Sequence, residues 1–96
     1  MVKIKAKKRL ESLINIGSKV AAGLREIGIN SPDELRQIGA VEAFLRMRLI
    51  SPHWNNKMLL YALYGALHDT NCMHLPDEVK LRLIEELNEN SQNPES

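Results

Sequence analysis

Apolar residues recur at helical spacing along most of the chain, and no stretch keeps the strict alternation of a β-strand. The most apolar segment, residues 55–68, is apolar on nearly every face, which predicts a helix buried by several neighbours or by a second subunit. We expect Asn55 or Asn56 to cap its start, and Gly65 within it to permit a close helix crossing. The pattern predicts an all-α fold of about five short helices around this central helix.

A first short helix is predicted to follow a turn at Gly17. Glycine tolerates a positive φ there, and Ser18 is a good N-cap because its hydroxyl can accept a free backbone N–H. Gly28 is expected to end the helix, with Leu24 and Ile29 as the apolar pair that accompanies a Schellman cap.

A second short helix opens at residues 31–34, where the sequence Ser-Pro-Asp-Glu forms a capping box with proline at the first helical position. Gly39 is expected to end it. The segments 24–29 (LREIGI) and 35–40 (LRQIGA) resemble each other, which we interpret as a recurring helix stop.

The stretch from residue 15 to 40 has the layout of a helix-hairpin-helix. A helix that starts after Gly17 directs free amides and the positive end of its dipole at whatever lies before it, with Lys19 beside them. Such modules hold one phosphate of a DNA strand in this way, although a plain turn with water on its amides has the same signature. The candidate nucleic-acid-binding residues are Gly17, Ser18, Lys19, Lys5, Lys8 and Arg9.

The segments on either side of residues 15–40 are also predicted to be helical. A helix is predicted over residues 5–14, whose lysines either line a phosphate backbone or form a solvated face. Another is predicted over residues 40–48, followed by a loop at residues 50–53. Trp54, near the end of that loop, is either a lid on the core or an exposed contact.

The C-terminal part is predicted to contain one more helix. Residues 69–75 form a connection, and Pro76 is expected at the first position of the helix, with acids in its first turn. Residues 88–96 are polar and lack an apolar stripe, which predicts disorder. The expected organisation is one helical domain over residues 1–87 and a polar tail over residues 88–96.

Composition narrows the class of protein. The 96 residues suffice for one domain, and with only four aromatic residues its core must be mostly aliphatic. A single cysteine excludes an internal disulfide and fits a reducing compartment. We expect a cytoplasmic protein, because there is no signal-peptide pattern and no apolar run long enough to span a membrane.

Charge is distributed unevenly although the net charge is only +1. Residues 1–26 carry seven Lys or Arg against two Glu, whereas residues 69–96 carry seven acids against two basic residues. A basic N-terminal part and an acidic C-terminal part fit either a nucleic-acid contact or protein docking.

Catalytic and metal-binding patterns are weak. His68, Asp69, Cys72 and His74 lie close together in sequence, but zinc sites usually need a second pair of ligands, and none follows. Glycine-rich phosphate loops are absent from the sequence. We expect neither an enzyme nor a cofactor or metal.

Four segments follow one another between about residue 13 and residue 87: a Gly-x-Lys turn at residues 17–19, a helix ending in Gly-Ile at residues 28–29, the segment Gly-Ala-Val-Glu-Ala at residues 39–43 and an apolar helix at residues 60–67. In this order they resemble the C-terminal domain of TfoX/Sxy-type competence regulators. The resemblance implies a helical domain related to SAM and helix-hairpin-helix folds and linked to the transcriptional control of DNA uptake. Asn15 stands where a helix-hairpin-helix often has its first glycine. The matching positions are Gly17, Lys19, Ala22, Gly28, Ile29, Gly39, Ala40, Val41, Glu42, Ala43, Leu60, Leu63, Gly65 and Leu67.

Three functions compete at this stage. The first is a regulatory module that binds the DNA backbone without sequence specificity. The second is a module that docks on a transcription-related protein or forms a homodimer without touching DNA, with Tyr61, Tyr64 and Gly65 of the apolar helix at the dimer interface. The third, ranked last, is a small enzyme built around His68, Cys72 and His74.

Overall fold

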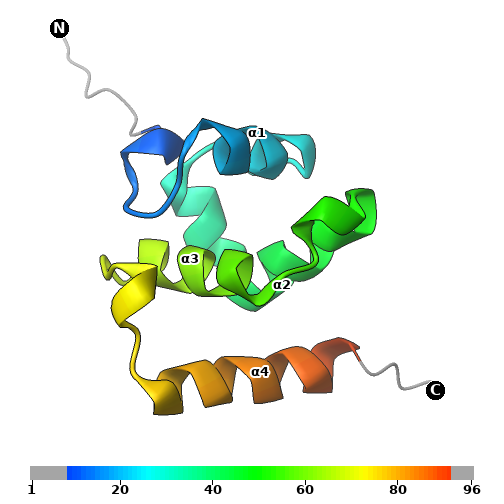
Figure 1. Cartoon of the computed structure of the whole chain (residues 1–96). Coiled ribbons are helices and arrows are strands. Elements are labelled where there is room, and N and C mark those ends of the chain that lie inside the picture. The colour runs from blue at the N-terminus through cyan, green and yellow to red at the C-terminus, as the bar shows by residue number, and fades with distance from the viewer. Residues whose placement is uncertain (1–8, 92–96) are drawn as a thin grey trace, which may run out of the picture.

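The computed structural model describes residues 9–91, and they form an all-α fold, as predicted. Figure 1 shows four α-helices joined by turns, with no strand among the described residues. The elements in chain order are η1 (Leu10–Ser12), α1 (Ser18–Glu26), α2 (Pro32–Ile50), η2 (Pro52–Trp54), α3 (Lys57–Leu67), η3 (Cys72–His74) and α4 (Asp77–Ser91), where η marks a single 3-10 turn.

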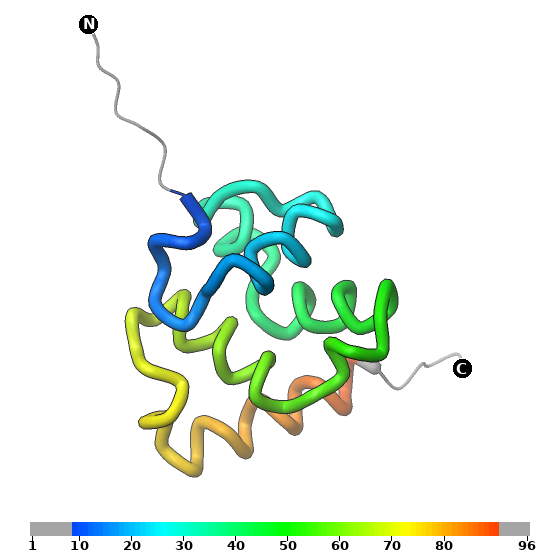
Figure 2. Tube along the Cα trace, turned by 45° about the horizontal axis from the view of Figure 1, so that its top comes forward, coloured from blue at the N-terminus to red at the C-terminus, as the bar shows by residue number. Residues whose placement is uncertain are grey.

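The pair α2 and α3 forms the centre of the molecule. Helix α1 packs on α2, and α4 contacts both α2 and α3 from the other side, so that α1 and α4 lie on opposite sides of the central pair (Figures 1 and 2). The core is mostly aliphatic, as the composition predicts. Its largest fully buried side chains are Phe44, Leu10, Leu24, Leu35, Met47, Leu60 and Leu63.

The end of α1 confirms the predicted Schellman cap. Gly28 has φ 90°, its N–H donates to the Arg25 carbonyl at 3.0 Å, and the Ile29 N–H donates to the Leu24 carbonyl at 2.9 Å. The predicted start is wrong by one residue. Gly17 is the N-cap, in an extended conformation with φ −90°, and Ser18 is already helical. Gly17 therefore does not need a positive φ.

Element α2 contains two helical segments that meet at a kink. Gly39 has the non-helical values φ 84° and ψ 165°, so the predicted helix stop at Gly39 and the further helix that begins at Ala40 are confirmed. At its start, the Ser31 hydroxyl accepts from the Glu34 N–H at 3.2 Å, whereas the Glu34 carboxylate accepts from Asn30 instead of Ser31. The second hydrogen bond of the predicted capping box is thus made with the N–H of Asn30, one residue before Ser31.

Helix α3 starts as predicted at a cap formed by Asn56, whose side chain accepts from the Leu59 N–H at 2.9 Å. The expectation of a helix crossing at Gly65 is wrong. A side chain there would overlap the carbonyl oxygen of Thr70 and the side-chain amide of Asn15, so a loop makes the close approach. Helices α2 and α4 and the turn η3 pack against α3 and bury Leu59, Leu60 and Leu63, whereas Met58 at its start is 48% exposed.

The predicted N-terminal helix is wrong in its described part. Residues 9–14 contain only the turn η1, after which Leu13 is extended and Asn15 takes a left-handed conformation with φ 72°. Residues 5–8 lie outside the described part of the chain. A helix could not continue through Asn15, because its side chain is held by a distant segment, described below.

Two predicted limits of α4 also change. Pro76 is not at the first helical position but one residue before it, since its carbonyl accepts the Lys80 N–H at 3.1 Å. The helix continues to Ser91, so the predicted disorder is wrong for residues 88–91, while residues 92–96 lie outside the described part. Leu87 is buried and anchors this end, and the Asn90 side chain donates to the Glu86 carbonyl at 2.7 Å.

Trp54 is a lid on the core. Its ring is half-buried, and it packs with Met47 over Gly23 so closely that a side chain at Gly23 would overlap both. Of the two roles considered from sequence, the structure selects packing over an exposed contact.

Candidate nucleic-acid interface

The turn before α1 exposes unpaired backbone donors. Gly17, Ser18 and Lys19 are all exposed, and the Gly17 carbonyl accepts the first helical hydrogen bond, from Ala21, at 2.9 Å. Within residues 9–91, no acceptor bonds the amides of Ser18, Lys19 or Val20, and the first turn of α1 contains no acid. The helix N-terminus is therefore open to an anion.

The space in front of this turn is also open. A Cβ built on Gly17 would have no described atom within 4 Å, and the φ of −90° is accessible to any residue. The backbone and the packing thus tolerate a side chain at Gly17. The absence of one leaves room for a ligand to approach the amides.

Asn15 fixes this turn to the far end of α3, and sequence reasoning missed that role. Its side-chain amide donates to the carbonyls of Thr70 at 2.9 Å and Ala62 at 3.3 Å, and its side-chain oxygen accepts from the Cys72 N–H at 3.1 Å. We call these three bonds the Asn15 clamp. The left-handed backbone of Asn15 is one that glycine would adopt readily, so the residue keeps the backbone shape of the usual glycine and adds a tether.

The basic candidates do not form one cluster. The guanidinium of Arg25 makes two hydrogen bonds to the Glu11 carboxylate, at 2.8 and 3.1 Å, and Arg9 lies 3.8 Å from the same carboxylate. Arg25 is in the last turn of α1 and Lys19 in the first, about 9 Å apart along the axis. Arg9 is thus beside the far end of α1, and among the basic candidates within residues 9–91 Lys19 is the one at the open turn. Lys5 and Lys8 lie outside the described residues.

The Arg25 guanidinium also perturbs the titration of Glu11. Its hydrogen bonds, aided by a backbone hydrogen bond within Glu11, lower the pKa of this carboxyl to about 2. Reciprocally, Glu11 raises the pKa of Arg25. The pair joins η1 to α1, and it engages a cation that could otherwise meet a phosphate.

The three residues predicted at a dimer interface have intramolecular partners. The Lys80 ammonium lies 5.5 Å from the centre of the Tyr61 ring, and Tyr64 stacks on His68 with ring centres 4.1 Å apart. Both tyrosines are half-buried. Gly65 is buried under Asn15 and Thr70 and is out of reach of a second subunit.

The structure does not bring the residues considered for metal binding or catalysis into one cluster. The His68 ring stacks on Tyr64, and Cys72 takes part in the Asn15 clamp through its backbone N–H and not through its thiol. Across residues 9–91, no three His, Cys, Asp or Glu side chains are grouped closely enough to hold a metal ion. None of the helices in this part is long and apolar enough to cross a membrane.

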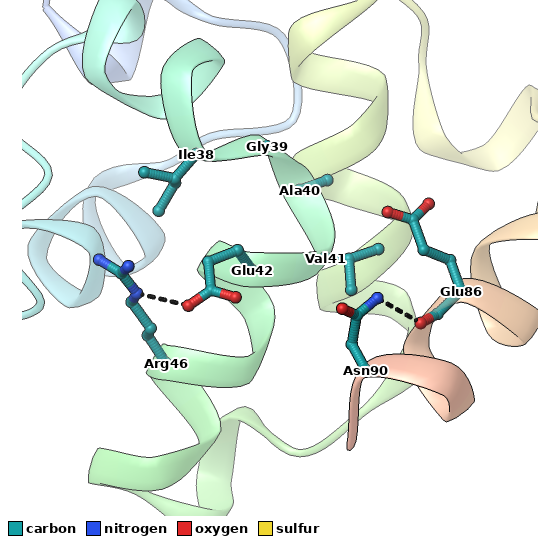
Figure 3. Close-up of a pocket in the computed structure, with 8 residues that line it drawn as sticks. All are labelled: Ile38, Gly39, Ala40, Val41, Glu42, Arg46, Glu86 and Asn90. Carbon is teal, nitrogen blue, oxygen red and sulfur yellow. Dashed lines mark hydrogen bonds and ion pairs between the residues drawn. The ribbon is translucent and has the colours of Figure 1, made fainter. Parts of the chain in front are cut away.

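A hollow of about 390 Å³ lies beside the break at Gly39, between α2 and the end of α4 (Figure 3). Sequence reasoning gave no sign of it, because it depends on how α4 packs. Glu42 and Arg46 form an ion pair at 2.8 Å on its α2 side, and Glu86 and Asn90 line its α4 side. Charges of both signs and hydrogen bonds within the lining make it a mixed polar surface.

Comparison with known proteins places the chain in a family and supports the fold. A family model described as the TfoX C-terminal domain matches residues 6–87. The crystal structure of an uncharacterized protein from Listeria monocytogenes, in a triclinic form, is similar with a TM-score of 0.78 and 30% sequence identity. The similarity covers 90% of this chain and 97% of that one. No curated protein matches.

Proposed function

We propose that this chain, which belongs to the TfoX C-terminal domain family, is a regulatory module that contacts the DNA backbone through the turn at Gly17–Lys19. The family supports a competence-related regulatory module in general. The contact with DNA is our addition, and the open N-terminus of α1 is the observation that carries it.

The chemistry of the turn suits a phosphate. Three amides that have no partner within residues 9–91, the positive end of the helix dipole and the exposed Lys19 all favour an anion at one point. Backbone amides and a lysine at a helix N-terminus contact phosphate, which carries no base information, so we expect binding without sequence preference. Such contacts give a Kd of roughly 10⁻⁴–10⁻⁶ M that weakens steeply with salt.

The experiment is a titration of a random-sequence duplex at several salt concentrations. Lys19→Ala should weaken binding modestly and reduce the salt slope by about one unit, because one fewer counterion is released. Lys57→Ala is the matched control, since Lys57 is also exposed near a helix start but belongs to α3. Equal effects of the two substitutions would reject the hairpin as the contact point.

Gly17→Val should obstruct DNA binding at the turn while the domain still folds. The open space and the ordinary φ at Gly17 predict a folded variant, with at most a modest loss of capping stability. The isopropyl group would occupy the space before the amides, so DNA binding should fall more than with Lys19→Ala. If the wild-type chain does not bind duplex at low salt, the proposal is wrong.

A further inference from the structure

We propose that the Glu11 carboxylate occupies a second phosphate position on the outward face of α1 and thereby lowers the affinity of this chain for DNA. The inference rests on the proposed function, because it concerns the same helix and the same ligand, the phosphate backbone. It adds a residue that opposes binding. It also predicts that Arg25 becomes a phosphate contact when the Glu11 carboxylate is removed.

The Glu11 carboxylate is bound in the geometry that arginine also uses for phosphate. The Nη2 and Nη1 atoms of Arg25 donate to its two oxygens, at 2.8 and 3.1 Å. A guanidinium presents this same planar fork to carboxylate and to phosphate oxygens. The Nε atom of Arg9 lies 3.8 Å from the same carboxylate. Two arginines thus converge on one anion, and that anion belongs to the chain itself.

Arg25 lies on the same face of α1 as the open turn. At about 100° per residue, Ser18, Ala22 and Arg25 follow one line along the helix, and Lys19 lies about 60° beside Ala22. All four residues are exposed, and the middle one, Ala22, has only a methyl group to obstruct a ligand. The residues that α1 buries point the other way, and they are Ala21, Gly23 and Leu24.

The spacing along this face suits one DNA strand. The axial rise from Lys19 to Arg25 is about 9 Å, because six residues rise by about 1.5 Å each. A strand of duplex DNA carries one phosphate for about every 3.4 Å of its axis, so this distance corresponds to roughly two to three nucleotides. A strand held at the turn and laid along α1 would therefore also reach Arg25.

Glu11 opposes such a strand in two ways. Its carboxylate is ionised at neutral pH, since the hydrogen bonds from Arg25 lower the pKa of Glu11 to about 2, and the negative charge repels phosphate. It also neutralises Arg25, so this cation displaces no counterion from DNA. The face of α1 thus holds fewer free cations than its sequence suggests.

The fold does not depend on Glu11 alone. The turn η1 is also anchored by Leu10, which is completely buried, and the Asn15 clamp holds the segment that follows. Both side chains of the pair are partly exposed, at 38% for Arg25 and 30% for Glu11. A variant without the carboxylate should therefore fold and present a free Arg25 to solvent.

The test is a titration of a random-sequence duplex with Glu11→Gln and Glu11→Ala at several salt concentrations. Each variant should bind about three- to tenfold more tightly than the wild type near 0.1 M salt. The salt slope should become steeper by about one unit, because one more phosphate contact is made.

Glu26→Gln is the matched control. Glu26 is exposed in the last turn of α1, and its substitution changes the net charge by the same amount, but the pair of Arg25 with Glu11 stays intact. This variant should tighten binding less than Glu11→Gln and should leave the salt slope unchanged.

Two further measurements separate a role in binding from a role in folding alone. Arg25→Gln, introduced into the Glu11→Gln chain, should remove the gain and restore the wild-type affinity and salt slope. Unfolding with guanidinium chloride should show that Glu11→Gln is less stable than the wild type although it binds DNA more tightly. A pair that only joined η1 to α1 would give lower stability without tighter binding.

The outcomes distinguish this inference from the proposed function. If neither the wild-type chain nor Glu11→Gln binds the duplex at low salt, both are wrong. If the wild type binds and Lys19→Ala weakens it, the contact at the turn stands. In that case, equal effects of Glu11→Gln and Glu26→Gln, or a gain that persists after Arg25→Gln, would overturn the role of Glu11 alone.

Discussion

Replacing Asn15 tests how the N-terminal turn is attached to the rest of the fold. The side chain makes three hydrogen bonds to residues 62–72, two of them at 3.1 Å or less and one at 3.3 Å. Removing it leaves the Thr70 carbonyl and the Cys72 N–H without these partners in a partly buried place. We expect Asn15→Gly to retain the left-handed backbone and to lose only the clamp.

The magnitude follows from the number of bonds. A net contribution of about 1 kcal/mol per hydrogen bond predicts a loss of roughly 2–3 kcal/mol for Asn15→Gly. Asn15→Ala should cost about 1 kcal/mol more, because alanine is strained at a positive φ. In a domain of this size, the loss for Asn15→Gly corresponds to a fall in Tm of about 10–20 °C.

Chemical denaturation with guanidinium chloride measures these differences. Asn56→Ala is the matched control, because it removes one asparagine hydrogen bond, to the Leu59 N–H, at an exposed helix cap. It should cost about 1 kcal/mol, clearly less than Asn15→Gly. If Asn15→Gly is as stable as the wild type, or if Asn15→Ala and Asn15→Gly are equal, the clamp or the strain argument is wrong.

Three further substitutions test the other features of the fold. Glu11→Gln should lower stability at neutral pH and remove a pH dependence of stability. Because the pKa of Glu11 is lowered in the folded state to about 2, its stabilising contribution is present above its ordinary pKa near 4.5 and is lost as pH falls towards 2. Acid titration of the wild-type and variant chains would show the difference. Gly28→Ala and Gly39→Ala should each destabilise by about 1 kcal/mol or more, because both positions have positive φ, and unchanged melting temperatures would reject the assignment. Gly65→Ala should cost roughly 1–3 kcal/mol by forcing the Thr70 carbonyl and Asn15 apart, and a variant as stable as the wild type would contradict this packing.

Local signals in the sequence determined several helix limits. The Schellman cap at Gly28, the Ser31 cap of α2 and the Asn56 cap of α3 each depend on atoms within five residues of one another, so their residue types are sufficient to predict them. The helical class follows for the same reason, because apolar periodicity is itself local. The turn before α1 was identified in this way as well, one residue from its true limit.

Contacts between distant segments decided the rest. Residues 9–14 have a helical pattern, but Asn15 bonds to residues up to 57 positions away, and these bonds replace the helix. A side chain at position 65 would overlap the loop at Thr70, and no residue near Gly65 in the sequence indicates that this loop lies there. Arg25 is a basic residue of the kind that contacts DNA. Its guanidinium, however, is already hydrogen-bonded to the carboxylate of Glu11, 14 residues earlier in the chain.

The same limit applies to the surfaces that partners use. The sequence by itself determined that α3 is apolar on nearly every face, and this favoured a second subunit there. Only the tertiary structure shows that α2, α4 and η3 pack against α3 and bury its leucines at 59, 60 and 63, and that Leu49 at the end of α2 is left exposed. Periodicity gives the apolar face of a helix but not the element that covers it, because that choice depends on how the whole chain packs.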